Sequence, residues 1–326
     1  MTAVNIIGLE DYLLSVISSE MRASASLEFL KAHAVISRSW AVAQLRSRHA
    51  HIGEIPFAAP DTPALVTWLE KTCHSERSEE SAQRLVKWFD HDDHKNYDFC
   101  ADDHCQRYQG LTLAIGESVR TAIDQTWGKI LTYDGEVCDT RFSKCCGGLT
   151  ERFSTCWEDK DLPYLPVKED PWCNTDDKAV LGQVLNDYDL ETPDFYRWTE
   201  EHSVEELSAL VREHSGIDIG TLTALTPLER GGSGRIKLLR FEGTKGSFEA
   251  GKELIIRRFL SRSHLKSSAF DAEFTADGKV ILRGSGWGHG VGLCQIGAAN
   301  MAAHGHSYQE ILDFYYPGSQ LTDDEN

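Results

Sequence analysis

A histidine and two cysteines near the middle of the chain form a combination that could bind a metal ion. His94 is followed by Cys100 and Cys105, with five and four residues between them. Two thiolates and one imidazole are typical zinc ligands, and three protein ligands leave a fourth position for water or another ligand. The spacing matches no common zinc-finger pattern. A Cys100–Cys105 disulfide, or two free thiols, is therefore the alternative.

A glycine-rich stretch near the C-terminus could hold an extended sugar polymer. Between Gly284 and Gly292 five glycines alternate with other residues and present Trp287 and His289. A sugar ring could stack on the indole, and the imidazole could bind hydroxyl groups. No Lys-Ser or Lys-Thr follows, so the stretch is not a nucleotide-binding loop. The alternative is a glycine-rich crossing of the core in which His289 is structural.

A second glycine pair lies in the segment from residue 141 to residue 151. Gly147 and Gly148 follow a short predicted strand and permit close approach of a ligand to the backbone. Ser143 and Thr150 flank them and could bind sugar hydroxyls. An ordinary tight turn explains the two glycines equally well.

A single carboxylate, Glu20, stands where an acid could assist cleavage of a glycosidic bond. Apolar residues at helical spacing predict an amphipathic helix over residues 8–19, and Glu20 continues their stripe. The carboxylate should therefore lie at the edge of a core, where burial favours its protonated form. A second helix begins near Ser24 or Ser26 and carries Arg38 on its inward-leaning side. Arg38 either contacts Glu20 or packs its stem while its head reaches water.

The remaining patterns predict a mixed α+β protein. The expected elements are a helix over 118–127, strands over 129–133 and 235–242, a helix opening with Ser203 as N-cap, a hairpin over 269–283 and a helix over 293–304. We expect one domain over residues 1–326, with a mixed sheet core, an N-terminal helical pair and a looped-out insertion. That insertion spans residues 49–90 and contains a short helix through Leu85 and Phe89. Residues 176–230 are expected to form a partly helical subdomain.

Composition excludes several classes of function. The formal charge of −18 argues against a nucleic-acid partner, and no apolar run is long enough to span a membrane. The first residues lack the pattern of a signal peptide, so either the protein is cytoplasmic or a signal segment is missing from this sequence. Cys156 and Cys173 flank a short proline-containing segment, which suggests a disulfide between them.

Taken together and in order, these segments resemble the stage II sporulation protein D (SpoIID/LytB) family. The Gly286–Ala298 segment is the most specific match. The matching segments are Leu9–Leu13 with Glu20, Leu30–Ala41, His104–Gly110, Gly147–Glu151, Gly286–Ala298 and Ile311–Gly318.

The resemblance implies a lytic transglycosylase that cleaves peptidoglycan glycan strands, preferentially strands without stem peptides, outside the cytoplasm. The family's catalytic glutamate corresponds to Glu20 and its helix arginine to Arg38. The zinc ligands of some relatives correspond to His94, Cys100 and Cys105. A second function found in the family is the alternative: glycan binding without cleavage, which enhances a partner cell-wall amidase. A third alternative, which rests on the three metal ligands and not on the resemblance, is a zinc hydrolase that uses this metal to activate water.

Overall fold

The computed structural model describes residues 4–22, 24–52, 83–88, 94, 97–101, 105–110, 116–185, 194–263 and 265–324. Most of the expected insertion, residues 53–82 and 89–90, lies outside the described residues. The described helices and strands mix in several sheets, which confirms the α+β prediction.

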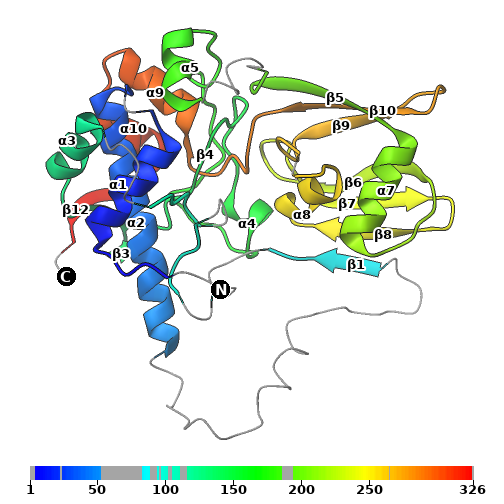
Figure 1. Cartoon of the computed structure of the whole chain (residues 1–326), viewed down its shortest axis with the longest axis horizontal. Helices are drawn as coiled ribbons and strands as arrows, with labels where there is room; N and C mark the ends of the chain where they lie inside the picture. Colours follow the sequence, from blue (N-terminus) through cyan, green and yellow to red (C-terminus); the bar gives the residue numbers. More distant parts are fainter. Residues whose placement is uncertain are drawn as a thin grey trace, which may run out of the picture.

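A helical body surrounds the long helix α2 (Leu27–Ile52) (Figure 1). The other members are α1 (Leu9–Glu20), α3 (Glu117–Gln125), α9 (Gln295–Ala303), α10 (Tyr308–Tyr315) and an antiparallel sheet of order β12 (Gln320–Asp323), β2 (Lys129–Tyr133), β3 (Glu136–Val137). Both α1 and α2 contribute apolar side chains to one core, in which Leu13, Ile17 and Phe29 are fully buried. The first helix thereby places Glu20, its last residue, at the border of this core.

A β-rich body lies on the other side of the molecule and has its own core (Figure 1). One sheet has the order β1 (Gln83–Val86), β8 (Gly246–Gly251), β7 (Ile236–Gly243), β6 (Leu222–Arg230). The other has the order β5 (Arg197–Ser203), β10 (Lys279–Ser285), β9 (Phe270–Phe274). Helices α7 (Val204–Ser215) and α8 (Glu253–Phe259) contact these strands. Stacked Phe241 and Phe248 are at the centre of the core.

Two segments of irregular chain form a seam between the bodies. One follows β3 and contains β4 (Phe142–Ser143) and α4 (Phe153–Cys156), and the other runs from β10 to α9 through β11 (Leu293–Cys294). Parallel pairing of β4 with β11 and bridges between Cys145 and Trp287 and between Glu151 and Val291 join these segments. Helix α5 (Lys178–Val184) packs beside α9. The expected single domain over 1–326, with a subdomain at 176–230, stays a prediction; the structure shows two cores joined by this seam.

Most elements agree with the sequence, and one does not. The helix that ends at Gly216 has Ser203 as N-cap, and the hairpin of β9 and β10 folds where expected. The short helix expected through Leu85 is wrong, because Gln83–Val86 is a strand that pairs in parallel with β8. Helix α2 also continues to Ile52, into the range expected to begin the insertion.

Candidate functional site

Glu20 is half-buried and lies near a tyrosine of its own helix. Tyr12 precedes it by about two turns of α1. The Tyr12 hydroxyl is buried and has no hydrogen-bond partner among the described residues. Burial raises the pKa of Tyr12, with further contributions from Cys105, Cys100 and Glu20. This hydroxyl is therefore within electrostatic reach of both the thiols and the candidate acid.

The structure brings His94, Cys100 and Cys105 together beside Tyr12. The Nε2 atom of His94 lies 3.1 Å from the Sγ atom of Cys105, and the backbone N–H of Cys100 donates to that sulfur at 3.4 Å. One ligand atom of each residue lies within 4.8 Å of the others. Neither cysteine forms a disulfide within the described part of the chain, and burial raises the pKa of Cys105 to about 12. This donor set fits a zinc ion, because a buried imidazole and two thiols converge on one point next to an unpaired hydroxyl.

The segment that carries these cysteines is fixed along α1. The Tyr12 ring stacks between Phe99 at 5.3 Å and Tyr108 at 5.7 Å. The Ser15 hydroxyl donates to the Gly110 carbonyl at 2.9 Å. Because Ser15 and Tyr12 both belong to α1, the candidate metal ligands and Glu20 are positioned by the same helix.

Arg38 lies at the opposite end of α1 from Glu20. Its guanidinium donates from Nε and Nη2 to the two carboxylate oxygens of Glu10, each at 2.7 Å, and from Nη1 to the Lys129 carbonyl at 3.0 Å. Glu10 and Glu20 are ten residues apart, which corresponds to roughly 15 Å along a helix. We therefore assign Arg38 to fixing α1 and β2 on α2, and the structure does not bring it together with Glu20.

Ser143 and Thr150 are buried in the seam, where their hydroxyls bond to backbone. Ser143 accepts from the Gly290 N–H at 3.2 Å, and Thr150 donates to the Pro166 carbonyl at 2.9 Å. A side chain at Gly147 would collide with the backbone of Gly286, where both residues have positive φ. These contacts explain the glycines by close packing of the two seam segments, which was one of the readings of the sequence.

Trp287 and His289 project from the glycine-rich segment and are half-buried. The Trp287 ring stacks on Phe195 at 4.7 Å, and the Lys144 ammonium lies 4.8 Å from its centroid. His289 packs edge-on against Trp157, and its Nδ1 accepts from the Val291 N–H at 3.0 Å. Burial and nearby guanidinium groups hold the pKa of His289 well below its usual range, so its imidazole is neutral.

A buried arginine that the sequence analysis missed organises this glycine-rich segment. Arg235 is fully buried, and its guanidinium donates to the carbonyls of Gly288 at 3.1 Å and Cys146 at 3.2 Å. Side chains at Gly286 or Gly290 would overlap this guanidinium. The sequence signal was present, because five alternating glycines indicate that something bulky lies close to the backbone. The sequence does not indicate which residue that is.

Two pockets lie away from Glu20. One of about 480 Å³ is lined by the Arg38–Glu10 pair together with Arg120 and Asp124. The other, of about 730 Å³, lies over β5, β9 and β10 and reaches Gly284 and Ser285 at the start of the glycine-rich segment. The second pocket is therefore the hollow adjoining the segment that carries Trp287.

The predicted Cys156–Cys173 disulfide is wrong. Both cysteines are free. Cys173 lies instead against two other thiols, with its Sγ atom 3.3 Å from that of Cys145 and 3.4 Å from that of Cys294.

Two parts of the chain match known protein families. A family model described as stage II sporulation protein matches residues 1–133, and one for a domain of unknown function (DUF8618) matches residues 151–292. These matches support the resemblance of the chain to the stage II sporulation protein D (SpoIID/LytB) family.

Three relatives match nearly the whole chain. The amidase enhancer of Bacillus subtilis (strain 168) is 28% identical over 95% of this chain, which spans 40% of that protein's length. Stage II sporulation protein D of Bacillus amyloliquefaciens is 26% identical, and that of Bacillus subtilis (strain 168) is 24% identical. Each of these two matches covers 98% of this chain and 76% of the relative. Within the described residues, no helix combines the length and apolar character needed to cross a membrane.

Proposed function

We propose that this protein cleaves peptidoglycan glycan strands as a lytic transglycosylase, with Glu20 as the single acid and base. The observation that carries the proposal is the position of Glu20. It is half-buried at the end of α1, in electrostatic reach of the buried Tyr12 hydroxyl, which is also in reach of the two thiols beside His94. Similarity to an amidase enhancer and to stage II sporulation proteins supports a role at the cell wall, and hence outside the cytoplasm.

The reaction needs only one carboxylate. Protonated Glu20 gives its proton to the oxygen between N-acetylmuramic acid and N-acetylglucosamine while the glycosidic bond breaks. The 6-hydroxyl of the same muramic acid then attacks the oxocarbenium-like carbon, and ionised Glu20 takes the hydroxyl proton. Because no water is activated, the second carboxylate of ordinary glycosidases is not required, and capture within one sugar benefits from proximity.

A zinc ion would be held by His94, Cys100 and Cys105. When bound, it would supply a fixed positive charge and would hold His94, Cys100 and Cys105 together. The buried Tyr12 hydroxyl would then lie within electrostatic reach of both the metal ligands and Glu20. We assign no step of bond cleavage to the metal.

We propose that the glycan strand binds at the seam between the two bodies. Trp287 offers a half-buried indole face, His289 a neutral imidazole, and Gly148 a half-buried backbone without a side chain. The pocket that reaches Gly284 and Ser285 adjoins this surface. Ser143 and Thr150, whose hydroxyls already bond to backbone, act by holding the loops rather than by touching sugar.

Mass spectrometry of glycan strands stripped of stem peptides tests the proposal. Wild-type protein should produce anhydro-muramic ends, and Glu20→Gln should produce none while still binding the strands. The matched control is Glu213→Gln, which makes the same change at an exposed position of α7 in the β-rich body. Anhydro ends produced by Glu20→Gln at the wild-type rate would refute the assignment of the acid.

The second candidate function is glycan binding that enhances a cell-wall amidase without cleavage. It is favoured by similarity to an amidase enhancer over 95% of the chain, and by the position of both pockets away from Glu20. In that case neither wild type nor Glu20→Gln makes anhydro ends, and both stimulate an added amidase equally. The same reaction mixtures distinguish the two candidates.

A further inference from the structure

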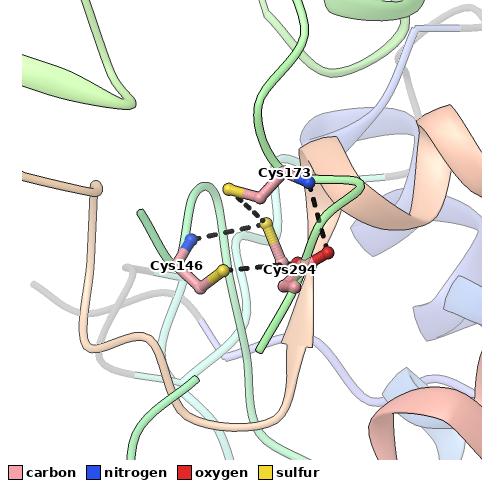
Figure 2. Close-up of side chains that lie close together, drawn as sticks. Cys146, Cys173 and Cys294 are labelled. Atoms are coloured by element: carbon pink, nitrogen blue, oxygen red, sulfur yellow. Dashed lines mark hydrogen bonds between the residues drawn. The ribbon is translucent and has the colours of Figure 1, made fainter. Parts of the chain in front are cut away.

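Four cysteines and one aspartate from three distant segments meet inside the seam. Cys145 and Cys146 follow β4, Asp170 and Cys173 belong to the loop before α5, and Cys294 lies at the N-cap of α9. All five residues are buried, with at most 2% of any of them exposed. Figure 2 shows the side chains of Cys146, Cys173 and Cys294 directed toward one another from separate stretches of chain.

The distances in this cluster fit a metal ion better than disulfides. The Sγ atoms of Cys173 and Cys294 are 3.4 Å apart, and the Sγ atom of Cys146 lies 3.3 Å from Oδ2 of Asp170. Sulfurs bound tetrahedrally to one zinc ion are about 3.8 Å apart, since each zinc–sulfur bond is about 2.3 Å. A disulfide would require about 2.05 Å. Moving to zinc geometry thus takes a shift of about half an ångström per pair, which is far less than bond formation needs.

Four of the five residues form a complete ligand set. Ligand atoms of Cys146, Asp170, Cys173 and Cys294 all lie within 4.8 Å of one another, which makes three thiols and one carboxylate around a common point. Cys145 contacts Cys173 but does not belong to that set. Three sulfurs and one oxygen are suited to Zn²⁺, which accepts both thiolate and carboxylate ligands.

The surroundings of the cluster would support bound ligands in their ionised forms. The sulfur of Cys294 accepts from the backbone N–H groups of Cys146 at 3.3 Å and Gly297 at 3.4 Å. The Tyr315 hydroxyl donates to Oδ2 of Asp170 at 2.9 Å, and the Trp172 N–H donates to Oδ1 at 3.0 Å. Outer hydrogen bonds of this kind orient metal ligands and fix their protonation.

The charge of the buried carboxylate also favours a bound cation. The Asp170 carboxylate is buried against the Cys146 thiol, the Tyr315 hydroxyl and the Trp172 N–H. Burying a carboxylate among thiols is costly unless a cation compensates it. A divalent ion would do so and would displace the thiol protons as it binds.

We propose that Cys146, Asp170, Cys173 and Cys294 bind a structural zinc ion in the seam. The ion ties together the turn that carries Gly147 and Gly148, the loop before α5, and the strand that follows the glycine-rich segment. It is separate from the site of His94, Cys100 and Cys105, with which it shares no residue. All four positions are filled by protein and are buried, so the site holds structure and leaves no position for substrate.

Zinc content measured on a chain that lacks the other site tests the proposal. The full-length Cys100→Ser/Cys105→Ser variant is purified, and the number of zinc ions per chain is measured by elemental mass spectrometry. One equivalent should remain. Adding Cys173→Ser should remove it, and adding Cys145→Ser, the neighbouring thiol outside the ligand set, should not. Loss of zinc with Cys145→Ser would overturn the proposed ligand set.

Because Cys173→Ser could fail to fold, a second measurement uses the intact ligands. Zinc is exchanged for Co²⁺ in the Cys100→Ser/Cys105→Ser variant, which should then show thiolate-to-cobalt charge transfer and the visible bands of tetrahedral cobalt. X-ray absorption of the zinc form should find three sulfurs and one oxygen.

Three findings would overturn the proposal: less than a tenth of an equivalent of zinc, iron in its place, or a disulfide of Cys173 found after alkylation of the unreduced protein. None of these measurements depends on glycan cleavage, so the proposed catalytic function can fail without affecting them.

Discussion

Replacing Arg38 by methionine should damage the stability of the protein and leave the chemistry of each folded molecule intact. The substitution keeps most of the buried stem and removes the guanidinium. It leaves the Glu10 carboxylate and the Lys129 carbonyl without their three hydrogen bonds. Breaking a buried ion pair by removing one partner costs about 3–5 kcal/mol. The side chain of Glu10 is 16% exposed, so water reaches it and the cost should be about 3 kcal/mol, near the lower end.

Urea unfolding followed by circular dichroism measures this loss, and release of anhydro ends measures activity. Arg212→Met, at an exposed position of α7, is the matched control and should change stability by less than about 0.5 kcal/mol. Arg38→Met/Glu10→Gln should recover part of the lost stability, because the stranded carboxylate is removed as well. The rate per folded Arg38→Met molecule should stay within about twofold of wild type.

Two outcomes would refute this account of Arg38. One is wild-type stability in Arg38→Met, which would mean that the pair with Glu10 contributes nothing. The other is a stable, folded Arg38→Met protein whose rate falls as far as that of Glu20→Gln. Such a result would place the guanidinium in the reaction despite its position at the other end of α1.

Two further predictions concern buried groups. Gly290→Ala should cost about 3 kcal/mol or more in unfolding free energy, because a Cβ at φ +75° would overlap the Arg235 guanidinium; Gly278→Ala, at φ +82° with open space around it, should cost about 1 kcal/mol. Equal losses in urea unfolding would show that the glycine-rich segment is not packed on Arg235. His33 is buried, which lowers its pKa from 6.5 to about 3. Below pH 6.5 the His33 imidazole is therefore protonated in the unfolded chain and stays neutral in the folded chain. The folding stability that is present above pH 6.5 is lost as the pH falls toward 3. Between pH 7 and 4.5 this loss amounts to about 2.5 kcal/mol, which His33→Gln should abolish; an unchanged pH profile would contradict the assignment.

Helices and strands whose ends are marked by a few neighbouring residues could be predicted from the sequence. Ser203 and Gly216 mark the two ends of α7 by a side-chain cap and by a left-handed φ of 73°. The hairpin of β9 and β10 is set by alternating apolar residues around a turn. The strand at Leu85 could not be found in this way, because its partner β8 is more than 160 residues further along the chain and four residues, two of them apolar, are too few to show a period.

The partner of Arg38 could have been derived from helix geometry. Six residues separate α1 from α2, and helices joined by so short a loop pack antiparallel. Arg38 is eleven residues beyond the start of α2, so it faces a position about eleven residues before the end of α1, which is the neighbourhood of Glu10. Placing it beside Glu20 ignored the direction of the second helix.

The cysteine cluster was beyond sequence reasoning for a different reason. Its members come from positions 28 and 121 residues apart, without the short paired spacings that identify a zinc site in a sequence. The apparent pairing of Cys156 with Cys173 rested on proximity along the chain. In the fold, Cys156 instead lies near the His289 carbonyl.

The Arg235 guanidinium and the proposed zinc ion, both buried in the seam, hold the same loop, which contains Cys146. Arg235 donates to the carbonyl of Cys146, and the thiol of Cys146 belongs to the proposed zinc site, so the guanidinium and the metal act on one residue from its backbone and its side chain. Arg235 also donates to the Gly288 carbonyl, between Trp287 and His289. Loss of the metal should therefore loosen the surface that carries Trp287, whereas none of the proposed ligands lies on α1, the helix that carries Glu20. Binding of glycan would then weaken more than the rate of cleavage of strands already bound.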